Sequence, residues 1–286
     1  MSGLKEAISD TIKNNRPKLG LSSVKTYVSI LSSLHKSMNA SGDSIDWFSD
    51  HVDDIIKHLE NKGDVSKKTI LSALYVLTGD DKYREIMMTV MKVVNDRYKE
   101  QKKTPKQMEN WISTDEIKQV YDDLHESAMK MLSKKSIIDE SKMMQFLLVA
   151  VLSGQVIPPR RSLDYSLMKI RNFDVKVDDY YKAGKFYFNK YKTSDTYKLQ
   201  VIELPEHFNK MLKQWIKINP TDYMVYGSTK QPLSSPQINR LLNKAFDGKN
   251  ISTNMLRHIY ISNVYKDLPQ LSKMQALASQ MGHSLD

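Results

Sequence analysis

The sequence contains no cysteine, only eight arginines and no long apolar run. Without cysteine there is no disulfide, thiol nucleophile or cysteine-ligated metal, which fits a reducing intracellular compartment. No stretch approaches the roughly 18 consecutive apolar residues that a membrane span requires, and the first residues lack the charged-then-apolar pattern of a signal peptide. Clustered carboxylates and histidines at metal-ligand spacing are also missing, so we expect no cofactor. Because no apolar run is long enough to span a bilayer, we expect no membrane partner.

Positive charge is what the chain has in excess. Lysine and arginine number 43 against 33 acidic residues, which gives a net charge of +10. Such a balance indicates a polyanionic partner, with nucleic acid the first candidate and an anionic membrane surface the second. Because lysine supplies most of the charge, the adjacent Arg160 and Arg161 stand out. A planar guanidinium can hold a phosphate with two parallel hydrogen bonds, which lysine cannot.

The chain of 286 residues favours two domains over one. Apolar residues recur at helical spacing through residues 1–101 and predict an all-helical domain of four or five short helices. Residues 102–110 are polar, basic and interrupted by Pro105, which predicts an interdomain linker. Residues 111–286 form the predicted second domain.

The second domain is predicted to be mostly helical with one small sheet. Residues 143–152 are nearly all apolar and predict a buried helix that leads to the arginine pair. Strand-like residues 185–189 and 199–204 flank turn-forming residues at 190–198, which predicts a β-hairpin. The predicted fold class is therefore mainly α with a small antiparallel β-sheet, an N-terminal helical bundle preceding a mixed α/β domain.

Three helix starts are predicted in the last quarter of the chain. Ser235 is the expected cap of one helix, with Pro236 at its first position. A second helix is expected from about Asn254. The third opens with an expected capping box of Ser272 and Gln275.

Four short motifs in the second domain suggest a function. They are Arg161-Ser162-Leu163-Asp164 after the buried helix, Lys192-Thr193 in the hairpin, Asn254-Met255-Leu256-Arg257-His258 at a helix start, and Met281-Gly282-His283-Ser284 near the end. Their order resembles the catalytic domain of the tyrosine recombinases, also called phage-type integrases. That family has an arginine, a hairpin lysine, a His-x-x-Arg box, a second histidine after glycine, and then a nucleophilic tyrosine.

The resemblance implies a site-specific recombinase that cleaves and rejoins double-stranded DNA through a 3′-phosphotyrosine. It implies that Arg161 and Arg257 clamp the reacting phosphate and that His283 adds a hydrogen bond to it. Lys192 would give a proton to the departing 5′ oxygen. The helical domain would be a DNA-binding clamp, and the partners would be recombination-site DNA and a homotetramer on paired sites, with a monomer expected without DNA.

Several positions depart from the family pattern or leave alternatives open. Arg160 is the second choice for the first arginine. Asn254 replaces the first histidine of the box, so it cannot exchange a proton, but it can bond a phosphate oxygen or cap the helix. His258 follows Arg257 directly and points about 100° away around an ideal helix, so it either contacts phosphate or packs.

The nucleophilic tyrosine of the family has no counterpart after His283 in this sequence. Tyr260 and Tyr265 lie before His283, which is the wrong side in the family's order. We therefore expect a truncated form of a longer enzyme, one that binds DNA without cleaving it.

Two other functions remain open from the sequence. A type IB topoisomerase uses a similar phosphate clamp, and a degenerate relative would bind DNA without catalysis, for which Asn254 is the best argument. The stretch Pro158-Pro159-Arg160-Arg161 resembles the variety carried by large eukaryotic DNA viruses and their satellites. That origin would place the protein in a host nucleus or a viral factory.

Overall fold

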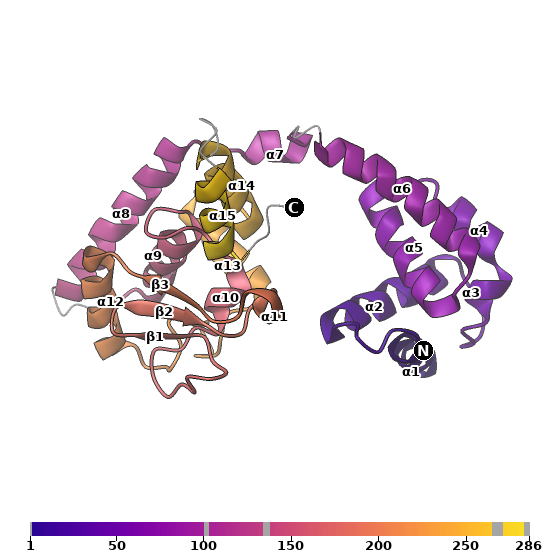
Figure 1. The fold of residues 1–286 in the computed structure, drawn as a ribbon, viewed down its shortest axis with the longest axis horizontal. Coiled ribbons are helices and arrows are strands. Elements are labelled where there is room, and N and C mark those ends of the chain that lie inside the picture. Colours follow the sequence, from indigo (N-terminus) through magenta and orange to yellow (C-terminus); the bar gives the residue numbers. More distant parts are fainter. Residues whose placement is uncertain (1, 100–102, 134–137, 265–270, 283–286) are drawn as a thin grey trace. The chain divides into compact units, whose positions relative to one another are not determined.

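The structure is a computed structural model that describes residues 2–99, 103–133, 138–264 and 271–282 (Figure 1). The chain divides into two compact units, Met1–Lys103 and Thr104–Asp286. Each unit has a hydrophobic core of its own.

The first unit is all helical in its described residues. Its elements are α1 (Ser2–Asn15), α2 (Leu21–Ser37), α3 (Trp47–Asp50), α4 (Val52–His58), α5 (Asp64–Thr78) and α6 (Asp81–Lys99). Apolar residues at helical spacing point inward, as Val24, Leu31 and Leu34 do on α2. Gly79 ends α5 in the left-handed conformation with φ of 74°, which a residue without Cβ adopts at no steric cost. Helices α1, α2 and α5 pack on one another, and α6 packs along α5.

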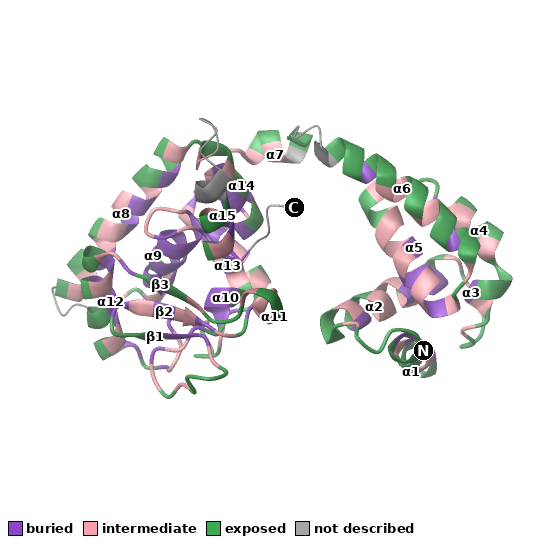
Figure 2. Cartoon of the chain, in the orientation of Figure 1, coloured by how far each residue is buried: buried purple, intermediate pink, exposed green. Residues whose placement is uncertain are grey.

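The second unit surrounds one buried helix. Its helices are α7 (Pro105–Asn110), α8 (Thr114–Ser133), α9 (Glu140–Leu152), α10 (Ser162–Ser166), α11 (Ser194–Tyr197), α12 (Glu206–Ile218), α13 (Ser235–Ala245), α14 (Thr253–Val264) and α15 (Leu271–Gln280). Every residue of α9 from Met143 to Leu152 is buried, as Figure 2 shows. Helices α8 and α13 pack against it, so the apolar run predicted as a buried helix is the centre of the core.

A three-stranded antiparallel sheet covers part of this core. Its strands are β1 (Tyr180–Lys182), β2 (Lys185–Phe188) and β3 (Gln200–Glu203), in the order β1-β2-β3. Phe186 pairs with Ile202 on β3 and with Tyr181 on β1, and all three side chains are buried in the core. The predicted class, mainly α with a small antiparallel sheet, is confirmed. Strand β1 was not predicted, because three residues are too few to show a period of two.

Some predicted boundaries need correction. The predicted linker, 102–110, contains helix α7, because Thr104 and Gln107 form a capping box and Pro105 suits a first helical turn. The cap of α13 is Ser234 rather than Ser235, since the Ser234 amide donates to Gln237 Oε1 at 2.8 Å. Helix α15 begins at Leu271, so Ser272 lies inside it and is not its cap.

Candidate functional site

The arginine pair lies between the buried helix α9 and the short helix α10. Gly154, with φ of 87°, turns the chain after α9, and Arg161 is the residue that immediately precedes α10. The Arg161 side chain is half-buried, and its Nη1 donates to the carbonyl of Gly282 at 2.8 Å. Among the described residues, Gly282 is the only hydrogen-bond acceptor of this side chain. Arg161 therefore reaches the end of α15, more than a hundred residues away in the sequence.

Arg160, the second choice, is bound by protein groups on several sides. Its side chain is fully buried, and Nε donates to Asp164 Oδ2 at 2.9 Å. Its Nη1 donates to the carbonyl of Gln280 at 2.6 Å and also to the side chain of Gln200. The guanidinium carbon lies 4.0 Å from the centre of the Phe188 ring. Asp164 therefore pairs with Arg160 rather than with Arg161. Protein groups hold Nε and Nη1 of Arg160, while its buried Nη2 has no partner among the described residues.

Arg257 is a buried cation with unused donors. It lies on α14 with 7% of its surface exposed, and its Nε and Nη2 have no hydrogen-bond partner among the described residues. Burial lowers the pKa of Arg257, and the charges of Arg161 and Arg160 lower it further, while Asp164 acts in the opposite direction. Leaving a buried charged donor unpaired is costly, so an anion that reached these nitrogens would stabilise the site.

The carboxylate of Asp164 is paired with Arg160 and is close enough to Arg161 and Arg257 for their charges to act on it. Burial raises the pKa of Asp164, and the charges of Arg160, Arg161 and Arg257 oppose that rise. One carboxylate faces three cations, so the cluster keeps an excess of positive charge. This electrostatic environment suits a phosphate group.

The loop between β2 and β3 brings Lys192 to the same region. Thr193 Oγ1 donates to the Gly282 carbonyl at 3.0 Å, so that oxygen accepts from both Thr193 and Arg161. Lys192 precedes Thr193 and is exposed. The loop is longer than a simple hairpin turn, because Thr193 starts the short helix α11 within it. Thr193 and Gly282 were not among the predicted site residues, although both lie inside the quoted motifs.

The remaining predicted residues of α14 lie at its surface. Asn254 and His258 are both exposed. Asn254 does not cap the helix, because the Met255 amide donates to the hydroxyl of Ser252 instead. Partial desolvation and the neighbouring charge of Arg257 lower the pKa of His258.

Two residues considered in the sequence analysis, His283 and Tyr265, lie outside the described residues. Tyr260 is described, and its ring packs on the backbone of Gly154: a Cβ built on that glycine would lie 2.1 Å from Tyr260 Cδ2. The structure thus brings together Arg161, Arg257 and the Lys192-Thr193 loop. It leaves Asn254 and His258 at the surface of the same unit.

No metal site or membrane span is evident where the structure describes the chain. Within those residues no three His, Asp or Glu side chains are grouped to hold a metal ion. None of the described helices is long and apolar enough to cross a bilayer.

The fold resembles that of a solved integrase. No protein-family model matches the sequence, and no curated protein matches it. Lambda integrase (residues 75–356) bound to DNA matches with a TM-score of 0.52 and 16% identity, over 99% of this chain and 94% of that one. XerH site-specific recombinase bound to difH substrate matches with a TM-score of 0.44 and 17% identity, over 98% of this chain and 90% of that one. XerA recombinase matches with a TM-score of 0.42 and 14% identity, over 99% of this chain and 90% of that one.

Of these three, the lambda integrase match carries the comparison, since the other two TM-scores are below 0.5. The chain therefore shares its fold with lambda integrase. At this level of identity the similarity concerns the fold alone.

Proposed function

We propose that this protein is a site-specific DNA recombinase or integrase of the tyrosine recombinase family. The observation that supports it best is the cluster of Arg161, Arg257 and the Lys192-Thr193 loop within a fold shared with lambda integrase. These residues come from three segments that are far apart in the sequence. Two guanidinium groups, with a lysine on an adjoining loop, can supply the donors of a phosphate clamp.

The proposed chemistry is phosphoryl transfer. Attack on a phosphodiester adds negative charge to the non-bridging oxygens, and fixed donors that meet this charge lower the barrier. In the proposal Arg161 and Arg257 hold those oxygens, assisted by His283. Lys192 protonates the departing 5′ oxygen, a contribution worth about 10²–10⁴ in rate. A tyrosine would form the covalent intermediate, so that rejoining needs no ATP.

Asn254 and His258 are assigned peripheral roles in this proposal. Both side chains are exposed on the first two turns of α14. An amide there can donate to a neighbouring DNA phosphate but cannot transfer a proton. We propose DNA-backbone contacts for Asn254 and His258 and the acid–base role for Lys192.

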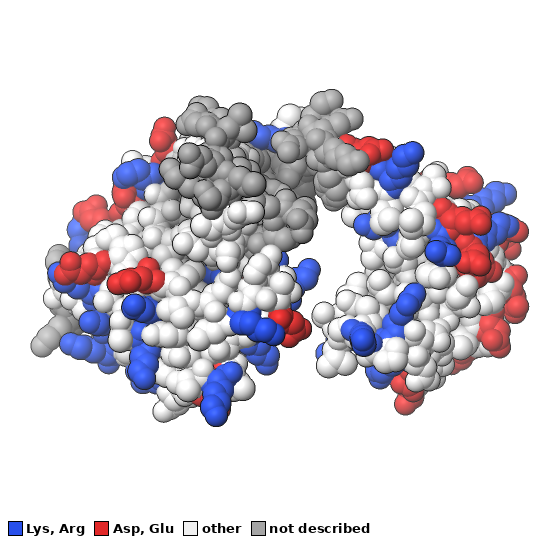
Figure 3. Space-filling view, in the orientation of Figure 1, with Lys and Arg blue, Asp and Glu red and all other residues white. Residues whose placement is uncertain are grey.

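The first unit is proposed to be the DNA clamp. Residues 11–42 contain no acidic residue but include Lys25 and Lys36, both exposed on α2. The rest of the exposed face of α2 is largely serine and threonine, residue types that often bond DNA phosphates. Acidic side chains gather instead over α3 and α4 (Figure 3). We propose that α2 faces the DNA backbone and that copies of the protein assemble as a tetramer on paired sites, from monomers without DNA.

The test is a covalent trap. The protein is incubated with nicked duplexes that carry candidate target sites, and adducts are sought by denaturing electrophoresis and mass spectrometry. We expect a 3′-phosphotyrosyl adduct that disappears in Arg161→Ala and Arg257→Ala but persists in Arg240→Ala, an exposed control on α13.

The same experiment separates the competing functions. Relaxation of supercoiled DNA without site preference would indicate a type IB topoisomerase. Tight duplex binding with no adduct at any site would indicate a non-catalytic relative, for which Asn254 in place of histidine is the supporting feature. Failure to bind duplex DNA at all would contradict the proposal.

A further inference from the structure

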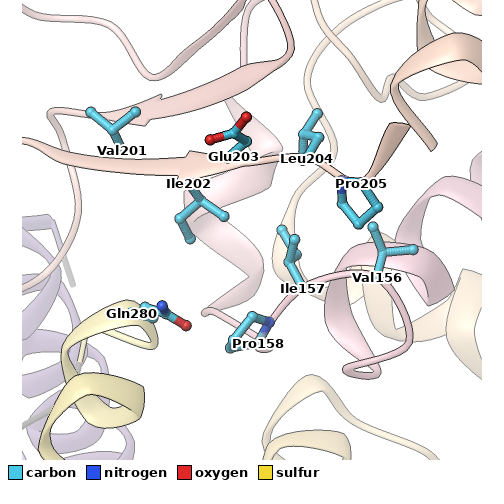
Figure 4. Close-up of a pocket in the computed structure, with 9 residues that line it drawn as sticks. All are labelled: Val156, Ile157, Pro158, Val201, Ile202, Glu203, Leu204, Pro205 and Gln280. Carbon is cyan, nitrogen blue, oxygen red and sulfur yellow. The ribbon is translucent and has the colours of Figure 1, made fainter. Parts of the chain in front are cut away.

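The C-terminal end of α15 has few apolar contacts to hold it. Among residues 275–280, whose side chains the structure describes, Ala278 alone is buried, and the buried Met281 follows the helix. A groove of about 470 Å³ opens between this end and the sheet (Figure 4). Its lining includes Ile157, Pro158, Ile202 and Gln280. Apolar packing therefore leaves one side of the helix end uncovered.

Polar side chains bind this end instead. The carbonyl of Ser279 accepts from Gln200 Nε2 at 2.6 Å, and the carbonyl of Gln280 accepts from Arg160 Nη1 at 2.6 Å. The Gly282 carbonyl accepts from Arg161 and Thr193. The last carbonyls of a helix have no partner inside the helix, and cations near them are favoured by the helix dipole. Two guanidinium groups thus satisfy the end of α15.

Gln200 connects the two halves of this arrangement. It lies on β3, at the edge of the sheet, and its side-chain amide both accepts and donates a hydrogen bond. The amide oxygen accepts from Arg160, while the amide nitrogen donates to Ser279. Arg160 is fixed in turn by its ion pair with Asp164 and by the ring of Phe188. The end of α15 is therefore held in place by Arg160, which directly precedes Arg161 in the sequence.

We propose that Gln200 and Arg160 form a latch, in which Gln200 is a positioning residue for the phosphate clamp. The latch docks the end of α15 on the edge of the sheet and holds the Gly282 carbonyl against Arg161 Nη1. That contact fixes the guanidinium plane and orients its other N–H groups for a phosphate. The docking needs no assumption about function, whereas its effect on DNA rests on the recombinase proposed above.

The sharpest variant is Gln200→Glu, which has nearly the same shape. Its carboxylate still accepts from Arg160 but cannot donate to Ser279, and its charge is repelled by the carbonyls at the helix end. We expect hydrogen exchange of amides 275–282 in the DNA-free chain to become about 10-fold faster or more, while α9 and β2 keep their protection. Gln214→Glu, the same charge change on the exposed face of α12, should leave exchange unchanged.

A second measurement tests the positioning role. Binding to a duplex is measured for Gln200→Glu, Arg161→Ala and the double variant. Because Gln200 acts through Arg161, the Arg161→Ala change should weaken binding less in the Gln200→Glu background than in the unaltered chain. With Gln214→Glu the two effects should be additive. Gln200→Ala, which removes both bonds without adding charge, should reproduce the exchange pattern.

The outcomes are distinguishable. Unchanged exchange at 275–282, or a uniform rise across Thr104–Asp286, would overturn the latch. Additive effects of Gln200→Glu and Arg161→Ala would overturn the positioning role. If exchange changes as expected but no form of the chain binds duplex DNA, the latch stands and the recombinase proposal fails.

Discussion

Arg257 combines features that are unfavourable in a residue that only stabilises the fold. It is buried, two of its nitrogens lack partners among the described residues, and Arg160 and Arg161 are close enough to lower its pKa. The sequence alone suggested its role through the spacing of one motif. The structure adds a physical argument for the proposed role, because an anion bound at these nitrogens would offset the cost of a buried, unpaired cation.

The first prediction follows from the energetic cost of burying the Arg257 charge without partners for two of its nitrogens. Replacing a buried, poorly paired charge with an apolar residue of similar length is often neutral or stabilising, so Arg257→Met should unfold at the same or a higher temperature. Duplex affinity should nevertheless fall about 10- to 100-fold, as expected for a lost charged hydrogen bond of about 1.5–3 kcal/mol. Arg240→Met removes one exposed charge and is the control. Marked destabilisation of Arg257→Met would show that Arg257 serves the fold through Asp164.

A second prediction concerns Gly154. Comparing it with Gly248 separates the stability cost of a close contact from the cost of backbone strain. Gly154 and Gly248 both have φ above 80°, but only Gly154 would place a Cβ against a neighbour, the ring of Tyr260. Gly248→Ala should cost about 1–3 kcal/mol through strain. Gly154→Ala should cost about 1–3 kcal/mol more through overpacking. Urea unfolding of both variants measures the difference, and equal losses would mean that Tyr260 moves aside freely.

The sequence could rank Arg161 above Arg160 but could not explain the choice. A motif records order and spacing, and both arginines fit the approach from the buried helix. The distinction lies in tertiary contacts, since Arg160 donates to the side chain of Gln200 and to the carbonyl of Gln280, and neither residue belongs to a motif. The role of Gln200 could not be predicted from the sequence, because this residue belongs to no motif. His283 remains a prediction, because it lies outside the described residues.

At the scale of secondary structure, the start of α8 shows how local chemistry sets a boundary. Ser113 and Glu116 form a capping box: the Ser113 amide donates to Glu116 Oε2 at 2.7 Å, and the Glu116 amide donates to Ser113 Oγ at 3.1 Å. Lys249 also donates to Glu116 at 3.0 Å. These bonds lower the pKa of Glu116 to about 2, with the bond from the Ser113 amide the largest cause.

The third prediction follows from the sign of this shift. A folded-state pKa below the ordinary value of 4.5 gives stability that is present above pH 4.5 and lost as pH falls toward 2. The melting temperature of Glu116→Gln should therefore be furthest below that of the unaltered chain near neutral pH, and the gap should narrow below pH 4.5. Ser113→Ala, which removes the hydroxyl partner and keeps the carboxylate, should retain part of this pH dependence. A gap independent of pH would contradict the assignment.

The elements that sequence patterns predicted least well are short. Helix α7 and helix α11 occupy segments predicted as a linker and a turn, and both consist mainly of polar residues. Polar residues give no apolar period, so only capping chemistry such as that of Thr104 and Gln107 could have indicated α7. The long apolar run that became α9 was predictable because its composition leaves no face for solvent.

At the scale of the whole chain, charge is divided unevenly within the first unit. Residues 11–42 lack acidic residues, whereas Asp46, Asp50, Asp53 and Asp54 follow closely and are all exposed. The net charge of +10 could be computed at once, but it does not say which surface carries it. The helical assignment makes this distinction, because it places Lys25 and Lys36 on exposed positions of α2 and the four aspartates near or on α3 and α4.

The fourth prediction tests this division through the salt dependence of DNA binding. Each phosphate contact contributes about 0.9 to the slope of log K against log salt concentration. If Lys25 and Lys36 each contact a phosphate, Lys25→Glu with Lys36→Glu should weaken duplex binding and reduce the slope by about 2. Lys57→Glu with Lys62→Glu makes the same change in net charge among the acidic residues of the unit and should leave the slope almost unaltered. Equal slopes for the two double variants would mean that net charge, and not a contact of α2, attracts the DNA.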